Sequence, residues 1–266
     1  MTRVAIAGAA GRMGQALITM VLANPGLKMV HVFEQPDHPL LGTDAGSLVG
    51  SDAVGLLITD AIEGAEFDVL IDFTSPMASM SHISYCKLHG RSIVIGTTGF
   101  NIDQRSEIDD MSTNMGIVIA PNMSIGVNLT FKLIELAART LGNTVDVEIV
   151  EAHHRHKVDA PSGTAIKMGE VVAETLGRNV MTDGIYSRHG QIGERDDNAI
   201  GFSTMRLGEL VGEHSIWFAG FGERLEISHK ATSRAIYATG AVRAALWLAD
   251  QPNGLYDMQD VLGLSG

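Results

Sequence analysis

The chain has 266 residues, of which 45% are hydrophobic, and its formal net charge is −12 because 31 acidic residues outnumber 19 basic ones. This length and composition are typical of a globular protein with one large or two ordinary domains, and the acidic balance argues against nucleic acid as a partner. Cys86 is the single cysteine, which excludes an intrachain disulfide. No apolar run approaches the roughly 20 residues of a membrane span, and the N-terminus lacks a secretory pattern, so we expect a cytoplasmic protein with no membrane partner.

The first half of the chain alternates short apolar runs with stretches typical of helices. The runs that predict buried strands lie at residues 3–7, 29–33, 67–73, 92–95 and 116–120. Helices are expected from the glycine-rich segment to about Leu22 and from Ser79 to Leu88. Buried strands that alternate with helices indicate a parallel sheet covered on both faces, so we predict a doubly wound α/β domain.

The pattern changes after about Asn122. The predicted helices of this part cover residues 128–141, 163–176 and 233–248, and the predicted strands cover residues 145–152, 200–206, 213–218 and 225–229. Successive strands with short glycine turns favour an open mixed or antiparallel sheet. We therefore expect one domain from residues 1–124 and 234–266, and a second α+β domain from residues 125–233.

A glycine-rich segment follows the first predicted strand and opens the first predicted helix, in the pattern G-x-x-G-x-x-G. Its members are Gly8, Ala9, Ala10, Gly11, Arg12, Met13 and Gly14. Bare backbone at such a turn lets pyrophosphate approach the helix N-terminus, and Arg12 adds a positive charge. Glu34 lies twenty residues after Gly14, where a carboxylate binds the ribose hydroxyls of a dinucleotide. The alternative is a glycine turn that binds nothing.

The residues after Glu34 bear on the choice of cofactor. NADPH requires a cation for its 2′-phosphate, and Gln35 supplies none, so we expect NADH to serve at least as well as NADPH. Two further turns follow predicted strands at the edge where ligands bind in such sheets, and we expect both to line the nicotinamide half unless they are plain turns. They consist of Gly96, Thr97, Thr98 and Gly99, and of Ala120, Pro121, Asn122 and Met123.

The segment from Glu151 to Ala165 holds three histidines, an arginine and a lysine within five consecutive residues. Lys157 can donate a proton, and a histidine such as His153 can position substrate or move a proton near neutral pH. If the segment is extended, His154 and His156 share one side, and His153, Arg155 and Lys157 share the other. A metal site is disfavoured, because the histidine spacing is wrong and the neighbouring cations repel a metal ion, so we expect none.

The same segment ends in a predicted helix start at Ser162, Gly163 and Thr164. Ser162 can cap the helix, and the amides of Gly163 and Thr164 can hold a carboxylate. Two anion sites within ten residues fit a small dianionic substrate, although a solvated charged loop is the alternative. Most polar residues at 212–214 and 226–234 are expected to be structural, because polar side chains alternate outward on half-buried strands.

Together these segments resemble the 4-hydroxy-tetrahydrodipicolinate (dihydrodipicolinate) reductase family of lysine and diaminopimelate biosynthesis. The similar stretches are Val4–Gly14, Val94–Phe100, Glu151–Thr164, Val211–His214 and Ser228–Ala231. The resemblance implies a Rossmann-like cofactor domain at residues 1–124 and 234–266, and a substrate-binding domain at residues 125–233 that builds a homotetramer. It implies hydride transfer from NADH or NADPH to the cyclic dicarboxylate, giving tetrahydrodipicolinate and water.

The resemblance also implies roles for individual residues. His153 falls on the proton donor or acceptor of the family and Lys157 on its proton donor. Its substrate contacts fall on His154, Gly163 and Thr164, and its cofactor contacts fall on Gly8–Met13, Glu34, Gly96–Thr98 and Ala120–Met123. One departure is Gln35, where some members carry an arginine. The alternatives are a dinucleotide-binding sensor without turnover and a reductase of another small cyclic dicarboxylate.

Overall fold

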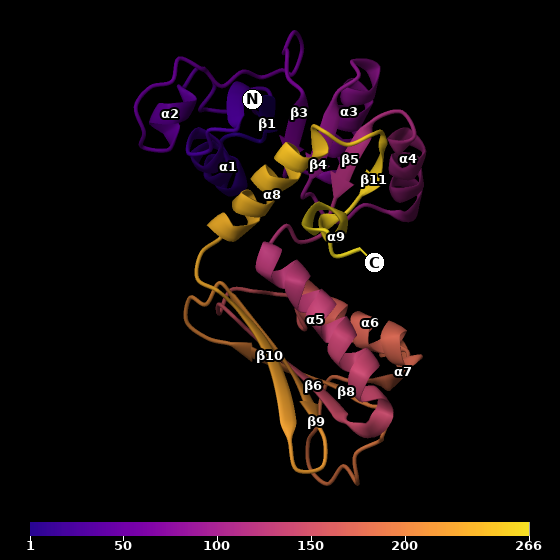
Figure 1. Cartoon of the computed structure of the whole chain (residues 1–266). Helices are drawn as coiled ribbons and strands as arrows, with labels where there is room; N and C mark the ends of the chain where they lie inside the picture. The colour runs from indigo at the N-terminus through magenta and orange to yellow at the C-terminus, as the bar shows by residue number, and fades with distance from the viewer. Residues whose placement is uncertain (266) are drawn as a thin grey trace. The chain divides into compact units, whose positions relative to one another are not determined.

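The computed structural model describes residues 1–265 and divides the chain into two compact units (Figure 1). The first unit comprises Met1–Ile125 and the segment that begins at Arg234, and the second comprises Gly126–Ser233. None of the helices within residues 1–265 has the length and apolar character that a membrane crossing requires.

The first unit is built on a six-stranded, fully parallel sheet. Its strand order is β11-β5-β4-β3-β1-β2, with β1 at Thr2–Ala7, β2 at Leu27–Phe33, β3 at Val69–Asp72, β4 at Ser92–Ile95, β5 at Gly116–Ile119 and β11 at Gly254–Tyr256. Its helices are α1 (Arg12–Leu22), α2 (Ala45–Leu48), α3 (Pro76–Leu88), α4 (Ile102–Ser112), α8 (Ala235–Leu248) and α9 (Met258–Leu262).

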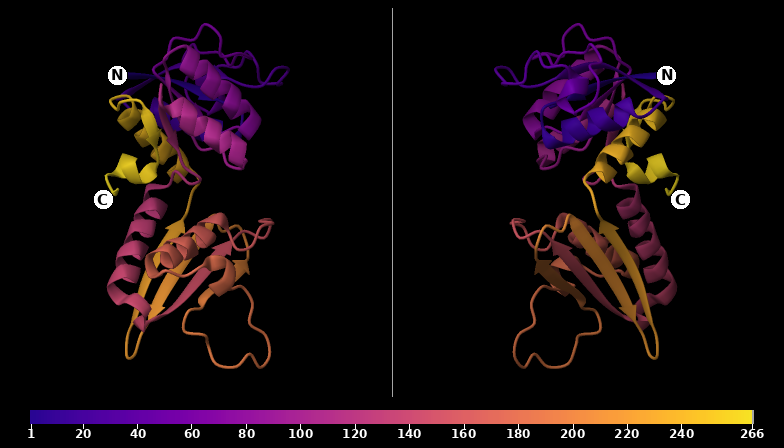
Figure 2. Two further views of the ribbon diagram at one scale, coloured as in Figure 1. Left: turned by 90° about the vertical axis from the view of Figure 1, so that its right-hand side faces the viewer. Right: turned by 90° about the vertical axis from the view of Figure 1, so that its left-hand side faces the viewer.

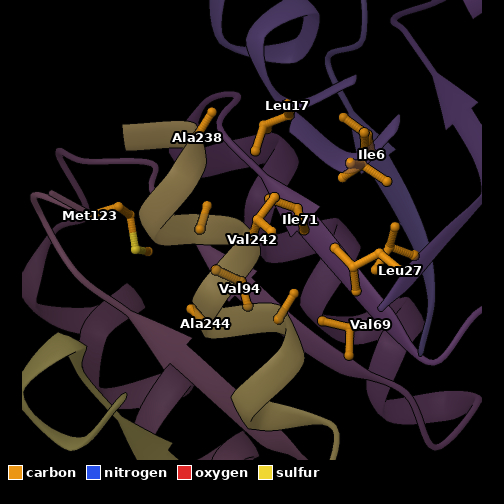
Figure 3. Close-up of a cluster of buried hydrophobic side chains, with 14 of the residues drawn as sticks. Ile6, Leu17, Leu27, Val69, Ile71, Val94, Met123, Ala238, Val242 and Ala244 are labelled. Carbon is orange, nitrogen blue, oxygen red and sulfur yellow. The ribbon is translucent and has the colours of Figure 1, made fainter. Parts of the chain in front are cut away.

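Alternation along the strands sends apolar side chains to both faces of this sheet. On one face Ile6, Ile71 and Val94 pack with Leu17 of α1 and Val242 of α8 (Figure 3). The opposite face makes a separate core with α3 and α4, which consists of residues such as Leu70, Ile83, Ile93, Ile95 and Ile108. The predicted doubly wound sheet is therefore confirmed.

The second unit is a mixed five-stranded sheet with helices against it. The strand order is β10-β9-β6-β8-β7, with β6 at Asp146–His153, β7 at Gly184–Ile185, β8 at Ile200–Arg206, β9 at Gly212–Ala219 and β10 at Arg224–Ala231. β6 pairs parallel with β8 and antiparallel with β9, which confirms the predicted mixed sheet. The helices are α5 (Ile125–Leu141), the 3₁₀ turn η1 (Gly142–Thr144), α6 (Gly163–Leu176) and α7 (Val180–Asp183), and α5 and α6 supply the core that covers the sheet (Figure 2).

Four elements of the first unit were absent from the sequence-based prediction: α2, α4, β11 and α9. The helix α4 buries only Ile108 and Ser112, so it shows little apolar periodicity, and its strongest signal is the capping box formed by Asn101 and Gln104. The helix α3 was predicted to begin at Ser79 but begins at Pro76, because Ser75 caps it and a proline suits the first helical position.

Candidate active site

The turn between β1 and α1 requires bare backbone at its glycines. Gly8 adopts a positive φ of 66°, and the Gly11 N–H donates to the Gly8 carbonyl oxygen at 3.1 Å. A Cβ on Gly14 would lie 2.1 Å from that same carbonyl oxygen. The loop therefore packs as tightly against the start of α1 as a phosphate-binding turn requires, and the residues present fit a dinucleotide.

Glu34 immediately follows β2 and contacts this loop. Its Oε2 accepts the Ala10 N–H at 3.1 Å, and its Oε1 accepts the Gln35 N–H at 2.9 Å. A cavity of about 490 Å³ opens beside it. The lining residues are Gly8, Phe33, Glu34, Gln35, Pro36, Asp60, Ala61, Ile62, Glu63, Thr74, Ser75, Ala78, Ser81 and His82. Three of these carry carboxylates and none is lysine or arginine, so this cavity suits a ribose with free hydroxyls better than a phosphorylated one.

The turn at Gly96 and Thr97 is fixed by packing and hydrogen bonding within the protein. A Cβ on Gly96 would lie 2.1 Å from the Phe73 ring, so glycine is needed there for packing. Thr97 is buried, and its Oγ1 accepts the Thr74 N–H at 2.9 Å. Of the four residues predicted here, Thr98 and Gly99 are exposed.

Beneath this turn lies a buried carboxylate that the sequence analysis missed. Asp72 ends β3 fully buried, with its Oδ2 2.8 Å from His82 Nδ1 and its Oδ1 accepting the Thr74 hydroxyl at 2.6 Å. Burial alone would raise the pKa of Asp72, but hydrogen bonds from His82 and Thr74 outweigh it and lower the pKa below its ordinary value. The aspartate is thus an ionised anchor that joins β3, α3 and the Gly96 turn.

The segment after β5 is only partly open. Ala120 is buried, Pro121 is exposed, and Asn122 accepts the Ser124 N–H through its Oδ1 at 2.9 Å. The Met123 side chain is 1% exposed and packs in the core of the first unit (Figure 3). Pro121 is therefore the most open residue of this turn.

In the second unit, the buried face of β6 changes from apolar to polar toward its carboxyl end. Val147 and Ile149 belong to the core, and the next two residues on that face are Glu151 and His153, at 1% and 8% exposure. His153 Nδ1 lies 2.6 Å from the Glu151 carboxylate. The neighbouring strands place Arg206 beside His153 and His214 beside Glu151.

The histidine-lysine segment is extended only as far as His153, so the sides expected for an extended segment do not apply beyond that residue. β6 ends at that residue, and a turn follows in which the Lys157 N–H donates to the His154 carbonyl at 3.1 Å. His153 is therefore buried while Arg155 is exposed, so they do not share a side. The rings of His154 and His156 still lie 6.3 Å apart. Lys157 Nζ donates to both oxygens of Asp159 at 2.7 Å, and this lowers the pKa of Asp159.

The start of α6 is as predicted a capped helix N-terminus. Ser162 is the N-cap, and its Oγ accepts the Ala165 N–H at 3.2 Å, while its own N–H donates to Glu151 at 3.0 Å. Both polar groups of Ser162 are thus used within the protein. Gly163 is exposed, with open space where a Cβ would be.

His214 corrects the expectation that the polar residues of its strand point outward. It is 4% exposed, on the same face of β9 as Ile216 and Phe218, and its Nε2 lies 2.8 Å from Ser162 Oγ. Burial, aided by the nearby His153, lowers its pKa to about 3, so it is neutral at pH 7. Its two-residue spacing from Ile216 is the signal that could have identified it.

Arg206 was also missed, because only strand register brings the end of β8 beside His153. Within residues 1–265, no three histidine, cysteine, aspartate or glutamate side chains come together as a candidate metal centre.

Comparison with known proteins assigns both units to one family. Residues 2–123 match the family described as dihydrodipicolinate reductase, N-terminus, and residues 126–262 match dihydrodipicolinate reductase, C-terminus. The chain belongs to the dihydrodipicolinate reductase family. The 4-hydroxy-tetrahydrodipicolinate reductase of Methylococcus capsulatus is 54% identical over 266 residues, covering 99% of each chain.

Solved structures agree with this membership. The dipicolinate-bound dihydrodipicolinate reductase from Paenisporosarcina sp. TG-14 has a TM-score of 0.79 at 28% identity, covering 98% of each chain. An amine dehydrogenase from Mycobacterium smegmatis, at 14% identity and a TM-score of 0.68, covers 96% of this chain and 94% of its own and shares the fold alone. The predicted family, fold class, oxidoreductase class and NAD(P)H dependence are confirmed.

Proposed function

We propose that this dihydrodipicolinate reductase family member reduces 4-hydroxy-tetrahydrodipicolinate, using NADH or NADPH, to tetrahydrodipicolinate and water. The proposal rests on one observation: two groups that can carry a proton and a helix N-terminus that can bind an anion lie in one short segment of the chain. His153 and Lys157 precede the N-terminus of α6 by only a few residues, and Glu151 binds both His153 and the Ser162 amide. The named activity of the relative from Methylococcus capsulatus supports the same reaction.

The proposed division of labour follows the chemistry of each group. When bound, the reduced nicotinamide supplies the hydride. Lys157 donates the proton and His153 assists, so that one hydride and one proton enter while the substrate hydroxyl leaves as water. His154 and Lys157 bind one carboxylate, and the amides of Gly163 and Thr164 bind the other, with Ser162 holding the helix start in place. That the relative from Paenisporosarcina binds dipicolinate, a planar dicarboxylate, supports a two-carboxylate site.

The cofactor residues belong to the first unit. We propose that the backbone from Gly8 to Met13 binds the pyrophosphate, aided by the Arg12 side chain. Glu34 would bind the adenosine ribose, and the cavity beside it, which Gln35 also lines, would hold the adenosine. Thr98 and the backbone of the Gly96–Thr97 and Ala120–Met123 turns would contact the nicotinamide half.

The domain roles and the assembly are also proposals. Residues 1–124 and 234–266 would bind the dinucleotide, and residues 125–233 would bind substrate and form a homotetramer. The outermost strand β10 offers a half-exposed Leu225, which is consistent with a buried contact in an oligomer. Light scattering of the purified protein would measure the mass directly. We also propose a cytoplasmic location for the enzyme.

The experiment that tests the reaction measures NADH and NADPH oxidation with substrate made in situ from pyruvate and aspartate semialdehyde by a synthase. Rapid oxidation that depends on the synthase is expected. Cofactor binding, followed by nicotinamide fluorescence, without oxidation would instead favour a dinucleotide sensor. Oxidation with other cyclic dicarboxylates only would reassign the substrate.

A further inference from the structure

We propose that Glu151 and Arg206 form a positioning pair that fixes His153, the start of α6 and the loop of Lys157 in one arrangement. The inference rests on the proposed function, because His153 and Lys157 have catalytic roles only in that reaction. Neither Glu151 nor Arg206 is proposed to touch the reacting atoms. Both act through residues that do.

The Glu151 carboxylate is saturated with donors from three different segments. Arg206 donates to both of its oxygens at 2.8 Å, in a bidentate pair. The Ser162 N–H donates to Oε1 at 3.0 Å, and His153 Nδ1 lies 2.6 Å from Oε2. A carboxylate at 1% exposure is costly to bury unless it is paired in this way. The site is therefore built around this charge.

The charge on Glu151 decides which nitrogen of His153 carries the proton. Burial alone would raise the pKa of Glu151, but the hydrogen bonds from Arg206, His153 and the Ser162 amide lower it below its ordinary value. An ionised carboxylate only accepts hydrogen bonds, so His153 Nδ1 must donate. The other ring nitrogen, Nε2, is then the atom that can exchange a proton with a ligand.

Gly212 on β9 faces that second nitrogen. A Cβ added at Gly212 would lie 2.9 Å from His153 Nε2, which is closer than such contacts normally are. The absence of a side chain at this position leaves room around Nε2, whereas Glu151 occupies the Nδ1 side. The two sides of the imidazole thus differ, as a proton-transferring histidine requires.

Arg206 extends the same network to the loop of Lys157. Its Nη2 donates to the Asp159 carbonyl oxygen at 2.6 Å, and the Asp159 carboxylate in turn accepts from Lys157 Nζ. One guanidinium therefore neutralises Glu151 and holds the backbone of the residue that binds the proposed proton donor. Planar, five-donor arginine suits this double role better than lysine does.

A purely structural ion pair is the competing explanation, and the same strand supplies a matched control. Glu148, three residues before Glu151, also forms a bidentate pair, with Arg188 at 2.8 Å for both contacts, and its Oε1 accepts a further hydrogen bond from Arg195 Nε at 3.2 Å. None of these contacts involves a proposed catalytic residue. Glu148→Gln therefore removes a glutamate–arginine pair from β6 without affecting the site.

The kinetic test compares Glu151→Gln, Arg206→Lys and Glu148→Gln with the wild-type enzyme. We expect Glu151→Gln to lower kcat at least about tenfold, Arg206→Lys to lower it less, and Glu148→Gln to leave it within about twofold. We also expect Glu151→Gln to cost much less in a His153→Gln background, because the carboxylate acts through the imidazole. Equal losses in Glu151→Gln and Glu148→Gln, or full additivity with His153→Gln, would overturn the proposal.

A spectroscopic test separates this inference from the reaction itself. In protein labelled with ¹⁵N-histidine at alkaline pH, the His153 ring signals are those that are absent from the spectrum of His153→Gln. In the wild type these signals should report a proton on Nδ1. In Glu151→Gln that preference should weaken or reverse, and in Glu148→Gln it should persist. A wild-type His153 protonated on Nε2 would refute the positioning role. Absent turnover in the wild type, by contrast, would refute the proposed function and leave this tautomer test intact.

Discussion

Ser162 and His214 are separated by 52 positions in the chain, yet Ser162 Oγ lies 2.8 Å from His214 Nε2. This contact joins the N-cap of α6 to β9, the strand next to the one that carries His153. The histidine is buried and has a second ring nitrogen, Nδ1, for which the described residues supply no hydrogen-bond partner. A charged imidazole would be expensive in this position, because burial disfavours the protonated form.

The first prediction concerns stability against pH. The pKa of His214 is about 3 in the folded protein, mainly through burial, and about 6.5 in the unfolded chain. Between these values the unfolded chain binds a proton that the folded protein does not, so the free energy of unfolding decreases as pH falls. From pH 7 to pH 5 this one group should cost about 2 kcal/mol.

Urea denaturation at the two pH values checks this prediction in the wild type and in His214→Gln. The wild type should lose about 2 kcal/mol more than the variant between them. His189→Gln, which alters an exposed histidine, serves as the control and should behave as the wild type. An identical pH dependence in the wild type and His214→Gln would contradict the prediction.

The sequence predicted the fold because its signals are local. The strands of the first unit are runs such as Val-Leu-Ile-Asp at Val69–Asp72, which bury both faces, and the glycine loop carries its own turn chemistry. The start of α6 could be predicted for the same reason, because serine is a strongly preferred N-cap residue and Ser162 occupies that position. By contrast, β11 has only three residues and owes its existence to pairing with β5.

The parts of the site that escaped prediction depend on contacts between distant segments. Arg206 meets Glu151 through the pairing of β8 with β6, and no local pattern encodes that register. In the sequence, Asp72 is only the last residue of an apolar strand, and its contacts with His82 and Thr74 are visible in the structure alone. Residues that close a buried polar network are therefore harder to predict than those that bind a ligand through a loop.

The second prediction concerns the choice between NADH and NADPH. The cavity beside Glu34 also bears Asp60 and Glu63, and these charges repel a 2′-phosphate while Gln35 offers no cation. We expect a lower Kd for NADH than for NADPH. Gln35→Arg should tighten NADPH binding about tenfold or more with little change for NADH.

Fluorescence titration measures both dissociation constants without requiring turnover. Asp60→Asn should also favour NADPH, by a smaller factor, because it removes a charge without adding a donor. Glu107→Gln, an acidic residue of α4 outside the cavity lining, is the control and should change neither constant. Tighter binding of NADPH than of NADH by the wild type would show that the carboxylates of the cavity, Glu34, Asp60 and Glu63, do not govern the choice of cofactor.

The third prediction separates two glycines of α6 that look alike in sequence. A Cβ on Gly169 would lie 2.5 Å from the Phe202 ring, whereas a Cβ on Gly163 would meet nothing within 4 Å. Gly169→Ala should therefore destabilise the protein by about 1–3 kcal/mol through overpacking. Gly163→Ala should change stability by less than about 0.5 kcal/mol.

The proposed substrate contact at Gly163 is its backbone amide, which Gly163→Ala retains. The KM for substrate should therefore stay close to that of the wild type. Thermal or urea unfolding of both variants provides the stability comparison, and the KM for substrate provides the second readout. A large rise in KM for Gly163→Ala, at unchanged stability, would indicate that substrate lies against its Cα.

The fourth prediction concerns the proposed proton donors. Lys157→Met keeps the aliphatic stem but removes the ammonium, and His153→Gln keeps a polar group but removes the exchangeable ring nitrogen. Each should lower kcat by about 10²–10⁴-fold, the usual contribution of a positioned acid or base. NADH binding should be nearly unchanged, since the glycine loop and Glu34 belong to the other unit.

Lys167→Met is the matched control, because that lysine of α6 is half-exposed and pairs only with Glu170 among the ion pairs of the described residues. Normal turnover in both Lys157→Met and His153→Gln would remove these residues from the mechanism. A loss of NADH binding in either would instead mean that the change had reached the cofactor unit, and kcat could then not be assigned to proton transfer.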